Sequence, residues 1–255
     1  MEPVYASVIT TARLLWLAEG LKFEISGVEN VPKSGPGVVA LNHTGYMDFT
    51  YAGIPAYLQG KRYVRFMAKK EVFDNKVSGP IMRALKHIPV DRANGADSYH
   101  QAVEYLKQGE LVGVYPEATI SRSFELKDFK NGAARMALES GAPLLPTVIW
   151  GAQRVWTKGY PKQLGRTGYK IMVGVAEPIE PVGDPDTLTA QLHKSMGEKL
   201  LELQDAYGEH PKGEFWVPAR LGGSAPTLEE ANRLDAEEKA ARDARRAARD
   251  ESSPE

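Results

Sequence analysis

Short strand-like runs alternate with segments of helical periodicity along most of the chain. The strand-like runs are five to eight residues long and cover residues 23–27, 37–41, 63–68, 111–115, 143–150 and 170–176. The helical segments cover residues 77–86, 98–108, 132–140 and 184–207. This alternation predicts an α/β fold: a three-layer domain with a mixed, largely parallel central sheet.

The pattern changes near both ends of the chain, which divides it into three parts. We predict an N-terminal amphipathic helix in residues 1–22, the α/β domain in residues 23–208, and a linker with a charged C-terminal tail in residues 209–255. From residue 227 onward the tail holds nine acidic and six basic residues and few large apolar ones. We therefore expect a partly disordered helix there and assign it no chemistry.

The N-terminal segment has one apolar face. Its apolar residues recur at helical spacing: Val4, Tyr5, Val8, Ile9, Ala12, Leu15 and Trp16. Arg13, Glu19 and Lys22 interrupt the run, which is shorter than the roughly eighteen apolar residues of a membrane-spanning helix. The helix either packs on the domain or lies on a bilayer surface, and the sequence leaves both open. With no secretory signal pattern at the N-terminus, we expect a peripheral protein on the cytosolic face of the cell membrane.

Composition argues against several classes of site. The 32 basic and 33 acidic residues balance, which argues against a nucleic-acid partner. The absence of cysteine excludes a thiol nucleophile and a thiolate-bound zinc. His87, His100, His193 and His210 share no ligand spacing with one another, so we expect no metal site.

Residues 42–48 carry the strongest chemical signal. A polar His43 appears directly after the apolar run 37–41, and Asp48 follows five positions later. Residues five apart on an ideal helix point about 140° away from each other, so the pair meets only if a turn folds Asp48 back. The carboxylate would then fix the tautomer of His43, which becomes a general base. With no cysteine and no G-x-S-x-G elbow, the nucleophile would be the hydroxyl of an acceptor molecule.

Four motifs in order resemble those of the glycerolipid acyltransferase family, which includes lysophosphatidic acid (1-acyl-sn-glycerol-3-phosphate) acyltransferases. They lie at residues 42–48, 88–92, 114–121 and 142–147, and residues 129–137 resemble the stretch between the third and fourth. The similarity extends over roughly residues 24–180. It implies the family's α/β fold and transfer of a fatty acyl chain from a thioester to the hydroxyl of a phospholipid precursor.

The resemblance implies roles for individual residues. His43 and Asp48 would be the catalytic base and its partner, Arg92 would bind the acceptor phosphate, Glu117 would position the acceptor, and Pro146 would shape the acyl or thioester site. The substrate-binding residues implied in this way are Asn42, Lys70, Arg92, Glu117, Thr119, Ser121, Arg122, Lys130, Gly132 and Pro146.

Two motifs depart from the family pattern. Ala118 and Ile120 stand where the third motif usually has Gly and Arg, and Lys86 stands where Gly usually opens the second. An isoleucine cannot replace a guanidinium as a bidentate phosphate partner. Arg122 is one residue that could compensate, and the acceptor could differ from lysophosphatidic acid.

The expected reaction is acyl transfer to a lysophospholipid, with acyl-CoA or acyl carrier protein as donor substrate and no tightly bound cofactor. Glycerol 3-phosphate, another lysophospholipid and a glycolipid remain alternative acceptors. If His43 activated water instead, the protein would be a thioesterase or lipid hydrolase. A non-enzymatic lipid-binding protein is the third class, against which the retained His43, Asp48 and Glu117 argue.

Overall fold

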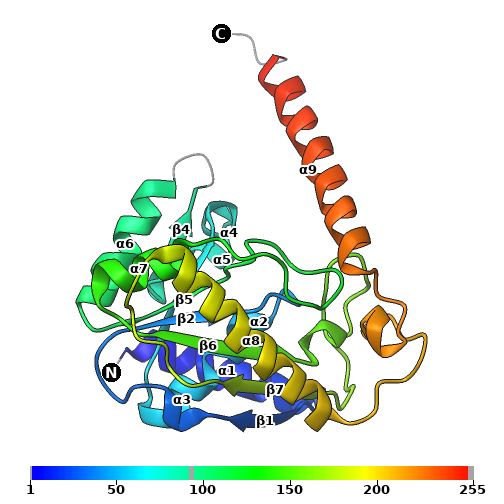
Figure 1. Ribbon diagram of the computed structural model, residues 1–255, viewed down its shortest axis with the longest axis horizontal. Helices are drawn as coiled ribbons and strands as arrows, with labels where there is room; N and C mark the ends of the chain where they lie inside the picture. Colours follow the sequence, from blue (N-terminus) through cyan, green and yellow to red (C-terminus); the bar gives the residue numbers. More distant parts are fainter. Residues whose placement is uncertain (1, 92–94, 252–255) are drawn as a thin grey trace. The chain divides into compact units, whose positions relative to one another are not determined.

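The computed structural model describes residues 2–91 and 95–251, and its centre is a seven-stranded sheet (Figure 1). The strands are β1 (Lys22–Ser26), β2 (Gly37–Leu41), β3 (Val64–Lys69), β4 (Ile88–Val90), β5 (Leu111–Val114), β6 (Leu144–Trp150) and β7 (Lys170–Val175). Their order is β1-β7-β6-β2-β5-β3-β4, and every neighbouring pair is parallel except β6 and β7. The prediction of an α/β fold with a mixed, largely parallel sheet is confirmed.

Helices cover both faces of the sheet. The helices described around the sheet are α1 (Pro3–Glu19), α2 (Asp48–Ala52), α3 (Ile54–Gly60), α4 (Lys70–Asp74), α5 (Ser78–Ala84), α6 (Gly95–Lys107), α7 (Gly132–Ser140) and α8 (Pro185–Tyr207). Short 3-10 turns lie at Val28–Asn30 and Ala152–Arg154. In β2, Val39 and Leu41 join the core beneath α2 and α3, while Val38 and Ala40 point to the opposite face, which α7 covers. All five residues of β2 are buried, which explains their continuous apolar run.

The chain forms two compact units. The first combines residues 1–120 and 128–208 and contains the whole sheet. The second combines the loop 121–127 with the chain from Glu209 onward, including the 3-10 turn Ala219–Leu221 and the helix α9 (Leu228–Glu251). No pattern in the sequence predicts the association of this loop with the tail.

The N-terminal helix directs most of its apolar stripe toward the domain. Tyr5 is buried, stacks on Tyr63 and donates a hydrogen bond to the carbonyl oxygen of Val64. Leu14, Leu15 and Leu17 are exposed. Most of the predicted stripe therefore faces the protein, whereas its members Val4 and Leu15 are exposed together with Leu14 and Leu17.

Candidate active site

The strand β2 is followed by the buried side-chain amide of Asn42, which links it to the neighbouring strand β6. The side chain of Asn42 accepts a hydrogen bond from the backbone N–H of Ile149 at 2.8 Å and donates one to the carbonyl oxygen of the same residue at 3.0 Å. Because Asn42 is buried and bonded on both sides, it fixes the point at which the chain leaves the sheet. In this structure Asn42 positions the backbone before His43.

A tight turn brings His43 and Asp48 together. The Nδ1 atom of His43 lies 3.0 Å from Oδ2 of Asp48, the first residue of α2. The same carboxylate oxygen accepts the backbone N–H groups of Thr44 at 2.7 Å and Gly45 at 2.8 Å. Residues 43–47 are not helical, so the angle of an ideal helix does not apply and the two side chains meet.

The turn needs a glycine at position 45. A Cβ atom there would lie 2.7 Å from the carbonyl oxygen of Trp156, which also accepts the backbone N–H of Tyr46. The hydroxyl of Thr157 bonds the carbonyl oxygen of Thr44 at 2.6 Å. The loop that follows β6 thus holds the outer side of the turn, while Asp48, which is fully buried, holds its inner side.

The third motif supports the His43–Asp48 pair from the neighbouring strand β5. The ring of Tyr115 stacks on the imidazole of His43, with centroids 4.1 Å apart and planes 24° from parallel. The Oε1 atom of Glu117 accepts the backbone N–H of His43 at 2.9 Å. Burial raises the pKa of Tyr115 well above its usual value, so its phenol is neutral at physiological pH. Tyr115 is a positioning residue that the sequence analysis did not single out, although its place directly after a buried strand was a usable signal.

The unusual Ala118 occupies a backbone conformation that favours glycine. Its φ is 60°, in the left-handed region, and its N–H closes a turn onto the carbonyl oxygen of Tyr115 at 3.0 Å. This explains why the family pattern has glycine here. Ile120, in the place of the usual arginine, is buried with 6% exposure.

The remaining residues of the expected substrate site are dispersed. Lys70 begins α4 after β3 and pairs with Asp91 at 3.3 Å, and Pro146 is buried in β6 beside Ala40 of β2. Thr119 is half-buried, Lys130 is exposed just before α7, and Gly132 begins α7. Ser121 and Arg122 belong to the second unit, and Arg92 lies outside the described residues. The structure brings Asn42, His43, Asp48 and Glu117 together.

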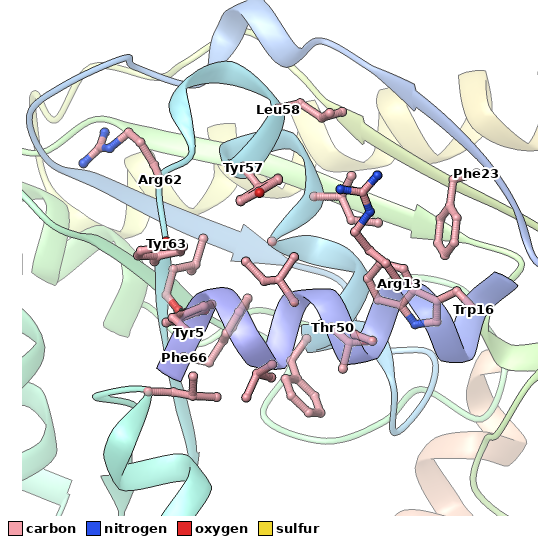
Figure 2. A pocket seen from close by; sticks show the side chains of 18 of the residues that line it. Tyr5, Arg13, Trp16, Phe23, Thr50, Tyr57, Leu58, Arg62, Tyr63 and Phe66 are labelled. Carbon is pink, nitrogen blue, oxygen red and sulfur yellow. Dashed lines mark hydrogen bonds between the residues drawn. The ribbon is translucent and has the colours of Figure 1, made fainter. Parts of the chain in front are cut away.

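An apolar cavity of about 340 Å³ lies beneath α1 (Figure 2). Its walls come from α1, β1, α2, α3 and β3, and the lining includes Ile9, Ala12, Trp16, Phe23, Phe49, Ile54, Tyr57, Leu58 and Phe66. His87 lies at the edge of the cavity, and burial lowers its pKa to about 4. The neutral imidazole of His87 accepts a hydrogen bond from the backbone N–H of Phe66. Phe49 and Thr50 follow Asp48 directly, so the wall of the cavity begins next to the His43–Asp48 pair.

Across residues 2–91 and 95–251, no group of three or more histidine and acidic side chains is placed to hold a metal ion. None of the helices described in those ranges combines the length and the apolar character that crossing a bilayer requires.

Replacing Tyr115 with leucine is expected to lower kcat about tenfold and to leave the KM for the acceptor nearly unchanged. A leucine keeps the apolar volume but lacks the flat face that holds the imidazole, and a poorly oriented base loses rate. Tyr115→Phe retains that face and should keep nearly full turnover. Steady-state kinetics of both variants test this, and equal losses in the two would show that the phenol rather than the stacked ring matters.

Comparisons with known proteins agree with this architecture. The family described as Acyltransferase matches residues 22–150. A 1-acyl-sn-glycerol-3-phosphate acyltransferase of Bacillus subtilis (strain 168) is 32% identical over 201 residues, which cover 78% of this chain and 90% of the relative. A probable 1-acyl-sn-glycerol-3-phosphate acyltransferase of Mycoplasma pneumoniae is 30% identical over 187 residues, 70% of this chain and 69% of the relative.

A solved structure also shares the fold. It is the crystal structure of the 1-acyl-sn-glycerophosphate (LPA) acyltransferase, PlsC, from Thermotoga maritima, with a TM-score of 0.59 and 24% sequence identity. The match covers 82% of this chain and 90% of that chain.

Proposed function

Since the chain belongs to the acyltransferase family, we propose that it transfers a fatty acyl group from a thioester to the free hydroxyl of 1-acyl-sn-glycerol 3-phosphate. The product would be a diacylated phosphate ester, a precursor of phospholipids. The contact of 3.0 Å between His43 and Asp48 is the observation that carries this proposal. The names of the relatives from Bacillus subtilis and Mycoplasma pneumoniae support the choice of acceptor.

The geometry supports a mechanism with His43 as base. With Nδ1 held by Asp48, Nε2 is free to take the proton of the acceptor hydroxyl while its oxygen attacks the thioester carbonyl. A new C–O bond forms, the tetrahedral intermediate collapses, and the C–S bond breaks. The imidazolium then returns its proton to the leaving thiolate. Asp48 stabilises the imidazolium charge in between.

The donor would be acyl-CoA or acyl carrier protein, used as a substrate, with no tightly bound cofactor. The apolar cavity beneath α1 suits the hydrocarbon chain, because its lining is mainly aromatic and aliphatic and its wall includes Phe49, next to Asp48. The acyl carbonyl would then lie near His43 with the chain extending under α1.

Filling the cavity is expected to change the preferred chain length. Gly53 lines it with an ordinary φ of −75°, and a Cβ added there meets no atom within 4 Å. Gly53→Leu should therefore fold normally, shorten the space for the chain, and lower kcat/KM for long donors about tenfold while sparing short ones. Gly165→Leu, in an exposed loop where a Cβ also meets nothing, is the control. An unchanged chain-length profile in Gly53→Leu would place the acyl chain elsewhere.

We also propose peripheral attachment to the cytosolic face of the membrane, because the lipid acceptor must be reached from water. The exposed Leu14, Leu15 and Leu17 of α1 are the side chains suited to insert into a bilayer surface. Vesicle flotation tests this, and failure to float with any lipid composition would contradict it.

A thioester assay with and without acceptor separates transfer from hydrolysis. We expect thiol release to depend on 1-acyl-sn-glycerol 3-phosphate and a diacyl product to appear by mass spectrometry. Release that is undiminished without acceptor would favour a thioesterase. A panel of glycerol 3-phosphate, other lysophospholipids and glycolipids then identifies the acceptor.

A further inference from the structure

Two cations of the loop 121–127 are held by carboxylates of the tail helix α9, within the second compact unit. Arg122 Nε lies 3.2 Å from Oδ1 of Asp235, and its Nη2 atom lies 2.7 Å from Oε2 of Glu238. Lys127 Nζ lies 2.5 Å from Oδ2 of Asp235. One carboxylate thus bridges the two cations, and a second completes the binding of the guanidinium.

The two cations form a built site rather than a pair of free surface side chains. The side chains of Arg122 and Lys127 are only 20% and 13% exposed. The loop between them is a compact turn, in which the hydroxyl of Ser121 bonds the carbonyl oxygen of Glu125 and Phe124 is buried. A salt bridge of 2.8 Å between Arg220 and Glu125 fixes the turn further.

The carboxylates imitate the charge of a phosphate ester. Asp235 and Glu238 together present about two negative charges to the cations, which is the charge of a phosphate monoester near neutral pH. Arginine with a neighbouring lysine is a common partner of phosphate oxygens. A phosphate could therefore replace both carboxylates and bind Arg122 and Lys127 at the same time.

The attachment of α9 is weak enough to be displaced. Its apolar contacts come from Leu228, Ala231 and Leu234 in the first two turns, and the described side chains after Glu238 are exposed. The ion pairs of Arg233 with Glu237 and of Lys239 with Asp243 lie within the helix itself. The side chain of Glu238 is 47% exposed, so its ion pair with Arg122 is open to salt and to competing anions.

We infer that Arg122 and Lys127 form a binding site for the phosphate of an anionic lipid, and that Asp235 and Glu238 occupy this site as an internal competitor. The tail helix α9 then lowers the affinity of this site for lipid. The inference rests on the proposed function for the kind of ligand, but its test measures binding and does not depend on catalysis.

The test compares two double variants of the full chain that remove the same charge from the same compact unit. Asp235→Asn with Glu238→Gln removes the carboxylates that hold Arg122 and Lys127. Glu209→Gln with Glu229→Gln removes two exposed carboxylates of that unit that lie outside this cluster of ion pairs. Binding is measured by flotation on phosphatidylcholine vesicles that contain phosphatidic acid or phosphatidylglycerol. Each cation released near an anionic surface contributes a factor of about five, so the first variant should bind at least about fivefold more strongly.

The control variant should bind like the natural sequence apart from a small general charge effect. A gain on phosphatidic acid alone would identify the phosphate monoester as the ligand, and a gain on both lipids would identify the anionic bilayer surface. Adding Arg122→Gln and Lys127→Gln to the first variant should abolish the gain. Equal gains in the two double variants, or a gain that survives loss of both cations, would overturn the inference even if acyl transfer is demonstrated.

Discussion

Replacement of His43 by alanine is expected to lower kcat by about 10²- to 10⁴-fold, the contribution of a well-placed general base. The fold should persist, because the turn is held by the backbone N–H groups of Thr44 and Gly45 on Asp48, and none of these contacts needs the imidazole. The KM for the acceptor should change little. The decisive measurement is kcat for thiol release at saturating acceptor, with circular dichroism to verify folding.

His100→Ala provides the matched control, since His100 is exposed on α6. It removes the same group from the same chain and should leave turnover intact. Turnover in His43→Ala close to that of the natural sequence would refute the proposed mechanism. A product formed by His43→Ala with water but not with acceptor would instead show that the base serves only the transfer reaction.

Replacement of Asp48 by asparagine should cost about 10³-fold or more in kcat, because the imidazolium formed during transfer loses its counter-charge. The amide oxygen can still accept the N–H groups of Thr44 and Gly45, so the turn should survive. Asp74→Asn, on the exposed end of α4, is the control.

A double variant separates a catalytic role from a structural one. If Asp48 acts through His43, the variant that carries both His43→Ala and Asp48→Asn should be little worse than His43→Ala alone. Losses that multiply in the double variant would show that Asp48 acts independently, for instance by supporting α2. Thermal unfolding of the three variants would then reveal a matching loss of stability.

The candidate residues for the chemistry could be proposed from the sequence because their neighbours have strong local patterns. The apolar runs at residues 37–41 and 111–115 predict buried strands, and polar residues directly after such strands mark the carboxyl edge of a parallel sheet. His43 was located in this way and by the ordered motifs, whereas Glu117 was located by the resemblance of the third motif.

The contacts among these residues required the tertiary structure. The sequence does not show that β5 pairs with β2. This pairing stacks Tyr115 on the ring of His43 and lets Glu117 accept the backbone N–H of His43. Strand order depends on packing between segments far apart in the chain, which local periodicity does not encode.

The two ends of the chain show the same division. Helical spacing predicted a helix with an apolar stripe at the N-terminus, but periodicity cannot say what covers the stripe, and the structure turns most of it toward the cavity beneath α1. The acidic composition of the tail was visible in the sequence, whereas its ion pairs with Arg122 and Lys127 join residues more than a hundred positions apart. The sequence by itself determined the fold class and most of the strands, because these depend on local patterns, and it predicted the reactive side chains from residue chemistry and motif resemblance. Only the tertiary structure decided which groups meet, because such contacts depend on how distant segments pack.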